Sequence, residues 1–239
     1  SRPIEESVNL DDWALRTPGF SGADLENLIN ESAILTARAN KSIVSNNEIE
    51  KALERITIGL QSTQLQDTGK KRLVAYHEVG HALVSILTPL ADKVDKVTIL
   101  PRSNGIGGFT RFSPNDEVLD SGLASKAYLY SKLVVSLGGR AAEIIIYGNN
   151  EVTQGASGDI QTVAQIARDM VTAFGFSKLG PQSLNSSSEE VFLGRDYLRQ
   201  KNTYSEEMIK AIDNEVRNLA NSAMSEAIKK LESKRQLMD

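Results

Sequence analysis

Residues 73–84 read Leu-Val-Ala-Tyr-His-Glu-Val-Gly-His-Ala-Leu-Val, and this stretch guides the interpretation of the whole 239-residue sequence. Within it, residues 77–81 match the pattern H-E-x-x-H. Side chains four residues apart lie one above the other on a helix, so two imidazoles at this spacing can converge on one metal ion. The flanking apolar residues give such a helix a buried face. The sequence therefore predicts a helix from Arg72 to Leu87 that ends near Pro89.

The two histidines of this motif, His77 and His81, are the only histidines in the chain. Ordinary helix residues can match the pattern by chance, but a shuffled sequence would place both histidines this way on the order of once in a thousand times. Glu78 follows the first histidine and is close enough to reach a water on the metal. A carboxylate there can take the proton of a zinc-activated water that attacks a peptide carbonyl. We therefore expect His77 and His81 to bind zinc and Glu78 to act as general base.

The third ligand has to be found among the acidic residues. A catalytic zinc usually has three protein ligands, and the chain has no cysteine and no further histidine. Asp159 lies in the first turn of a predicted helix, where it could instead serve helix electrostatics. Glu143 lies in an apolar segment, where it could instead pair with Arg140 or orient a ligand histidine. The residues alone favour Asp159 only slightly, and the group that stabilises the oxyanion stays open among zinc, Tyr, Arg and backbone N–H groups.

Composition excludes several classes of protein. The chain has 27 Lys+Arg and 31 Asp+Glu, a net charge of −4, which argues against nucleic acid as a partner. The absence of cysteine excludes a disulfide framework and a thiol nucleophile. No Walker A motif is present, no apolar run approaches the roughly 18 residues of a membrane span, and the first residues do not form a signal peptide. We expect the chain as given to be soluble.

The first 60 residues predict a small helical unit. Ser21 can cap a helix with Asp24 three residues later, and a second helix follows Ser45. Two or three short helices bury little surface by themselves. We therefore expect this piece to pack on something absent from the chain. The polar segment 59–71 is interpreted as a linker.

The remainder predicts a mostly helical domain with a small β-sheet. Segment 105–112 could offer a strand edge to an extended substrate or form a plain hairpin, and the two interpretations are about equally supported. The predicted elements are strands at 94–100 and around 109, a helix at 123–137 that ends before the Gly138-Gly139 pair, a helix capped by Ser157 that runs to about 174, a helix from Ser205 onward, and a loop at 182–203.

Several strings of residues match one known family in its own order. The chain resembles the C-terminal part of FtsH-type proteases, which are membrane-anchored, ATP-dependent zinc metalloproteases. Because the strings extend over nearly the whole chain, the resemblance is specific. The matching strings are 17–25, 74–82, 137–143, 155–159, 174–177 and 192–196.

The resemblance implies a mainly α fold, with a helical AAA lid at residues 1–60 and a zinc metallopeptidase domain at 61–239. It implies Asp159 as third ligand beside His77 and His81, with Glu78 catalytic. The implied cofactor is Zn²⁺, with ATP and Mg²⁺ only in the full-length parent. Gly158 and Ile144 depart from the residues usual in the family, but neither change removes a ligand or the base.

The resemblance also implies partners and a location. These are unfolded or damaged polypeptide substrates, like subunits in a homo- or hetero-hexamer, and a membrane reached through a segment absent from this chain. Residues 120–123 are similar to those of plastid and cyanobacterial members, which favours a thylakoid over a bacterial or mitochondrial inner membrane. The alternative is a proteolytically silent subunit that supports active neighbours in the ring.

Overall fold

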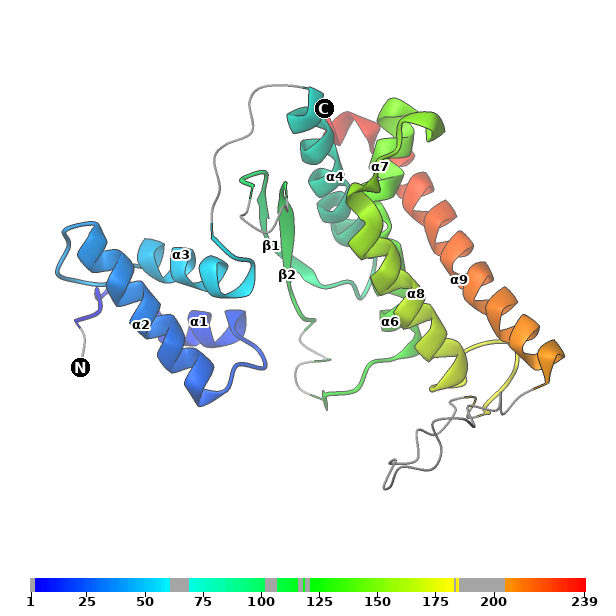
Figure 1. The fold of residues 1–239 in the computed structure, drawn as a ribbon, viewed down its shortest axis with the longest axis horizontal. Coiled ribbons are helices and arrows are strands. Elements are labelled where there is room, and N and C mark those ends of the chain that lie inside the picture. The colour runs from blue at the N-terminus through cyan, green and yellow to red at the C-terminus, as the bar shows by residue number, and fades with distance from the viewer. Residues whose placement is uncertain are drawn as a thin grey trace, which may run out of the picture. The chain divides into compact units, whose positions relative to one another are not determined.

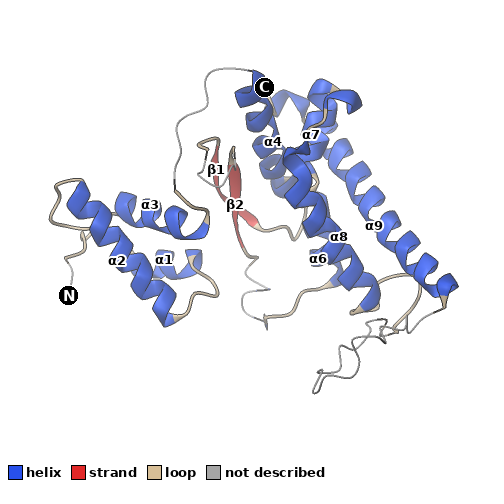
Figure 2. Cartoon of the chain, in the orientation of Figure 1, coloured by secondary structure: helices blue, strands red, loops and turns tan. Residues whose placement is uncertain are grey.

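The computed structural model is mainly helical with a two-stranded antiparallel sheet, as predicted (Figures 1 and 2). It describes residues 3–60, 69–101, 107–115, 118, 121–182, 184 and 205–239. Most of the predicted linker at 59–71 and of the predicted loop at 182–203 lies outside these residues, as does the string 192–196.

Contacts divide the chain into two compact units. Unit 1 is Ser1–Ala75 with Asp95–Ser113, and unit 2 is Tyr76–Val94 with Pro114–Asp239. The domain boundary near residue 60 stays a prediction.

Unit 1 contains three helices around a small apolar core: α1 (Leu10–Arg16), α2 (Gly22–Arg38) and α3 (Asn46–Thr57). The predicted start of α2 is confirmed, because the Ser21 hydroxyl accepts from the backbone N–H of Asp24 while the Asp24 carboxylate accepts from the N–H of Ser21. This reciprocal capping satisfies two N–H groups that a helix start leaves unpaired. The buried core consists of Trp13, Leu28, Val44, Ile49, Ala52 and Leu53.

The two predicted strands are present as β1 (Lys93–Thr98) and β2 (Phe109–Ser113), which pair with each other, and part of the connection between them lies outside the described residues. Within unit 1 the Arg111 guanidinium donates to Glu50 on α3 at 2.7 Å and also pairs with Asp95 on β1. Burial disfavours the charged guanidinium, but these two carboxylates outweigh it and raise the pKa of Arg111. The strand pair is thus held to α3 by ion pairs.

Glu48 on α3 gives unit 1 a measurable pH dependence. The residue is 2% exposed, and hydrogen bonds from the Ser45 hydroxyl and the Lys41 ammonium lower the pKa of its carboxyl from 4.5 to about 2. Because the folded pKa lies below the unfolded value, the stabilisation is complete above pH 4.5 and is lost as the pH falls towards 2. We expect about 2 kcal/mol of it to be lost between pH 7 and pH 3.

Urea unfolding followed by fluorescence of Trp13, the only tryptophan, measures this stability in the same core. The difference in free energy of unfolding between wild type and Glu48→Gln should decrease by about 2 kcal/mol from pH 7 to pH 3. The exposed Glu26→Gln variant serves as control and should keep a constant difference. A difference for Glu48→Gln that does not change with pH would contradict the assignment.

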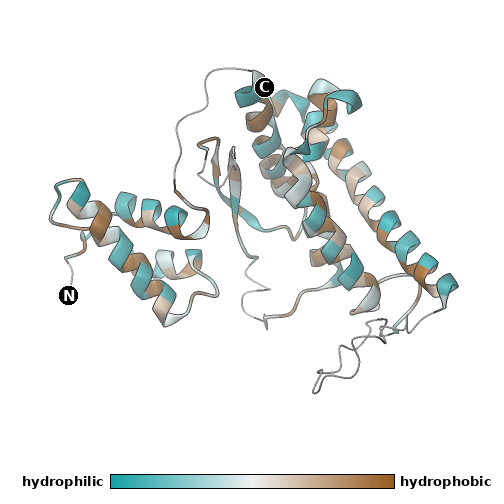
Figure 3. Ribbon diagram, viewed as in Figure 1, coloured by the Kyte–Doolittle hydropathy of each residue, from teal (hydrophilic) through white to brown (hydrophobic). Residues whose placement is uncertain are grey.

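Unit 2 is a packed set of helices that carries the candidate site. The helix α9 packs against α6, α7 and α8, and α8 and α9 run side by side (Figure 1). Hydrophobic and hydrophilic residues are mixed along both helices (Figure 3), as expected for surface helices with one buried face. The helices are α4 (Gly69–Ile86, whose first residues belong to unit 1), α6 (Lys126–Ser136), α7 (Gly138–Tyr147), α8 (Ser157–Thr172) and α9 (Glu206–Ser233).

Two local predictions differ from the structure. The predicted helix at 123–137 does end just before the Gly138-Gly139 pair, as α6, but a further helix that the sequence did not predict, α7, begins at Gly138. A Cβ on Gly138 would lie 2.7 Å from the carbonyl oxygen of Gly80, so the glycines are explained by the close approach of α4 and α7. Ser157 was expected to cap α8 but is its first helical residue, because a 3₁₀ turn at Gln154–Ala156 leads directly into the helix.

No helix in the described part of the chain is both long enough and apolar enough to cross a membrane.

Candidate metal centre

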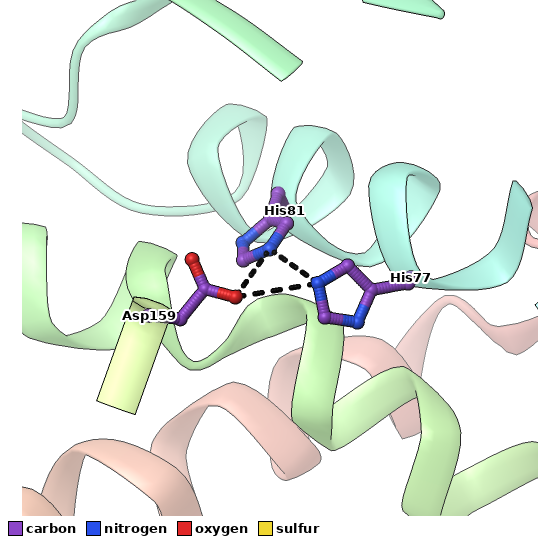
Figure 4. Close-up of side chains that lie close together, drawn as sticks. All are labelled: His77, His81 and Asp159. Atoms are coloured by element: carbon purple, nitrogen blue, oxygen red, sulfur yellow. Dashed lines mark hydrogen bonds and ion pairs between the residues drawn. The ribbon is translucent and has the colours of Figure 1, made fainter. Parts of the chain in front are cut away.

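Three predicted site residues converge in unit 2 (Figure 4). One turn of α4 separates His77 from His81, and their Nε2 atoms lie 3.1 Å apart. Asp159, from the first turn of α8, places Oδ2 3.3 Å from His77 Nε2 and 3.4 Å from His81 Nε2. The histidines are 9% and 7% exposed, whereas the Asp159 side chain is 30% exposed. The three polar atoms thus meet in a mostly buried place that is more exposed on the side of Asp159.

The other ring nitrogens determine the tautomer of each histidine. His81 Nδ1 lies 2.9 Å from the carbonyl oxygen of Val135, which can only accept, so this nitrogen carries the proton. His77 Nδ1 lies 2.8 Å from Oε1 of Glu143, which is completely buried. With an ionised Glu143 the same proton assignment follows for His77. Both neutral rings therefore direct a lone pair from Nε2 towards Asp159.

Three acceptor atoms that face one another favour a positive charge between them, either as protons on the ring nitrogens or as a metal ion. Burial disfavours a charged His77, but hydrogen bonds to Asp159 and Glu143 outweigh it and raise the pKa of His77. Burial also disfavours an ionised Asp159, but hydrogen bonds from His77 and His81 outweigh it and hold its pKa well below the ordinary value. Both shifts express a preference for positive charge among the three residues. Two imidazole nitrogens and one carboxylate oxygen also form a donor set that suits zinc.

Gly139 keeps the space in front of the rings free. A Cβ at this position would lie 2.5 Å from His77 Nε2 and 2.6 Å from His81 Nε2, closer than Cβ atoms approach other atoms. The helix α7 can therefore pass the two ring nitrogens only with glycine here. The surrounding atoms thus fit a metal ion held at the two Nε2 atoms.

We expect Gly139→Ala to abolish or greatly weaken zinc binding, because the methyl group displaces the rings from their positions. Zinc titration against a chromophoric chelator measures the change. Gly158→Ala is the matched control, since a Cβ on Gly158 of α8 meets nothing within 4 Å and alanine favours a helix. Equal zinc affinity in both variants would contradict this role of Gly139.

The remaining candidates lie near the centre in different places. Glu78, the predicted base, follows His77 on α4 and is 6% exposed. Glu143, the other candidate ligand, contacts the Nδ1 side of His77 and is not among the three converging groups. Sequence reasoning missed the carbonyl of Val135 and the role of Gly139. A backbone carbonyl has no sequence signal, whereas the Gly138-Gly139 pair was a signal but indicated only the end of the preceding helix.

Comparison with known families assigns both parts of the chain. Residues 64–239 match the sequence profile of Peptidase family M41, and residues 7–51 match that of the AAA+ lid domain. The M41 match includes all residues of the candidate centre.

Individual relatives are similar over the whole chain. ATP-dependent zinc metalloprotease FtsH 3 of Synechocystis sp. is 46% identical over 240 residues, and the chain covers 39% of its length. ATP-dependent zinc metalloprotease FtsH of Cyanidium caldarium is 47% identical over 238 residues, with 38% of its length covered. ATP-dependent zinc metalloprotease FTSH 2, chloroplastic, of Arabidopsis thaliana is 45% identical, with 34% covered. The chain therefore spans less than two fifths of each of these relatives.

Proposed function

The chain belongs to peptidase family M41, and from this premise we propose that its metal centre is a zinc endopeptidase active site. His77, His81 and Asp159 would hold the ion, and Glu78 would act as general base. The observation that carries the proposal is the meeting of three acceptor atoms, His77 Nε2, His81 Nε2 and Asp159 Oδ2, within 3.1 to 3.4 Å of one another.

Each residue has a defined task in peptide hydrolysis. A zinc ion, when bound, supplies a Lewis acid and lowers the pKa of a water from about 16 to about 7. The Glu78 carboxylate accepts the proton of the attacking water and returns it to the leaving amine nitrogen. Glu143 and the Val135 carbonyl hold the two Nδ1 sides of the rings, which fixes the ring orientations so that both Nε2 atoms would be available to a bound ion.

We propose unfolded or damaged polypeptides, including membrane proteins, as substrates. A longer parent protein would supply the ATPase core and a membrane segment, and would assemble as a homo- or hetero-hexamer. The relatives named FtsH and the AAA+ lid match at 7–51 support this proposal. The chloroplastic and cyanobacterial relatives support a thylakoid location. In this proposal the domain boundary lies near residue 60, between the two matched ranges.

A proteolytically silent ring subunit is not favoured. Such a subunit needs neither two histidines with fixed tautomers nor a carboxylate brought to them from another helix. A mutation in any of these residues would leave a purely structural role intact.

Metal removal tests the proposal. Treatment with 1,10-phenanthroline should abolish cleavage of fluorescently labelled casein, and a stoichiometric amount of Zn²⁺ should restore it. Mg²⁺, which prefers oxygen ligands, should not restore it. Cleavage that persists in protein verified by elemental analysis to be free of metal would contradict the proposal.

A further inference from the structure

A short segment connects α7 to the helix that carries Asp159. It comprises residues 148–156 and is called the strap here, with 3₁₀ turns at Asn149–Glu151 and Gln154–Ala156. The first turn of α8 has no side-chain cap, so its own residues do not fix where the helix begins. The position of Asp159 in that turn therefore depends on how the strap is held.

Two side chains of α7 hold the strap at Thr153. Arg140 Nη2 donates to the carbonyl oxygen of Thr153 at 2.7 Å. The N–H of Thr153 donates to Glu143 Oε2 at 2.8 Å. Positions 140 and 143 are one helical turn apart and so lie on the same side of α7. Both backbone groups of one strap residue are thus bonded by neighbouring side chains of a single helix.

These bonds connect the two halves of the metal centre. Glu143 bonds His77 through Oε1 and the strap through Oε2, so one buried carboxylate contacts both a ligand ring and the segment leading to Asp159. Thr153 also caps the second 3₁₀ turn, since its hydroxyl accepts from the N–H of Gly155 at 3.2 Å. Arg140 is therefore linked to Asp159 through its hydrogen bond to Thr153 and through the single 3₁₀ turn that follows Thr153.

Ion pairing does not explain the presence of Arg140. Among the described residues, no carboxylate forms a salt bridge with it, although Glu143 lies one turn away. The Arg140–Glu143 pair, one of the alternatives left open by the sequence, is replaced by two separate bonds to Thr153. The guanidinium is thus used to hold a backbone carbonyl.

We propose that Arg140 is a positioning residue of the metal centre, which holds the strap so that Asp159 reaches His77 and His81. The inference rests on the proposed zinc site. Arg140 contacts no metal ligand directly and acts through Thr153. Its loss should leave the two histidines in place and release the carboxylate.

Zinc affinity of a variant series tests this inference. Arg140→Gln should raise the zinc dissociation constant about 10- to 100-fold, as loss of outer-shell partners does. Arg140→Lys, which keeps one cationic donor, should give an intermediate value. Arg168→Gln on α8 is the matched control, because Arg168 is exposed and pairs with Asp213. This control variant should bind zinc as tightly as wild type.

A double-mutant cycle distinguishes positioning from general structural damage. In an Asp159→Asn background, adding Arg140→Gln should change zinc affinity by less than about threefold. The carboxylate that Arg140 positions is already absent there. The ligand-field spectrum of the Co²⁺-substituted Arg140→Gln protein should shift from that of wild type towards that of Asp159→Asn. If Arg140→Gln does not fold, Arg140→Lys takes its place in the cycle with the same expectation.

Two results would overturn the inference. One is a full 10- to 100-fold effect of the Arg140 variant in the Asp159→Asn background. The other is unchanged zinc affinity and an unchanged Co²⁺ spectrum in Arg140→Gln. Failure of wild type to bind zinc would instead overturn the proposed function itself, so the two failures are distinguishable.

Discussion

Glu78→Gln is expected to lower casein cleavage about 100- to 10,000-fold while the protein keeps its zinc. The amide has nearly the shape of the carboxylate but cannot accept the proton of the attacking water. The zinc ligands are untouched, so metal content by elemental analysis should equal that of wild type. Initial rates of casein cleavage, measured on protein of verified zinc content, provide the test.

Glu232→Gln, an exposed change of the same chemistry near the end of α9, is the control and should cleave casein at the wild-type rate. Equal cleavage by Glu78→Gln and wild type would show that another group acts as base. Loss of zinc from Glu78→Gln would show that Glu78 helps to hold the ion. Each result would contradict the role proposed for Glu78.

Asp159→Asn is expected to have the second large effect, a loss of zinc affinity. The substitution removes the only anionic member of the converging set and leaves two neutral imidazoles. Zinc affinity should fall by more than the roughly 10- to 100-fold that loss of an outer-shell partner causes, and cleavage should fall with it. Competition with a chelator of known affinity measures the first effect.

Asp169→Asn is the matched control on the same helix. Among the described residues its carboxylate accepts from the Gln165 amide at the surface, and an amide oxygen can accept the same bond. Zinc affinity should stay at the wild-type value. If Asp159→Asn binds zinc as tightly as this control, the third ligand lies elsewhere.

Much of the fold could be predicted because local chemistry and tertiary packing favour the same structure. The Ser21–Asp24 capping pair and the apolar residues around His77 each specify a helix that the structure contains. The membership in the FtsH-type family, indicated by the motifs, is confirmed by the comparisons. The helix α7 was missed, because two glycines are poor helix formers and only the distant contact with Gly80 explains them.

The site was predictable to the extent that its residues are chemically rare. A chain with two histidines, both in H-E-x-x-H, restricts a zinc site to one helix. The residues alone left the choice between Asp159 and Glu143 open, because both are acidic residues far from the motif in sequence, and the family resemblance implied Asp159. The structure places Asp159 on the Nε2 side of the rings and Glu143 on the Nδ1 side of His77. The hydrogen bonds of Thr153 to α7 have no sequence signal, since they use its backbone.

Anomalous scattering at the zinc absorption edge, from crystals of the purified chain, tests the central claim most directly. The account predicts a single strong peak about 2.0–2.2 Å from His77 Nε2, His81 Nε2 and a carboxylate oxygen of Asp159. Glu143 should remain on His77 Nδ1, outside the coordination sphere. A zinc ion bound by other residues, or an Asp159 side chain turned away from an ion that the histidines hold, would contradict it.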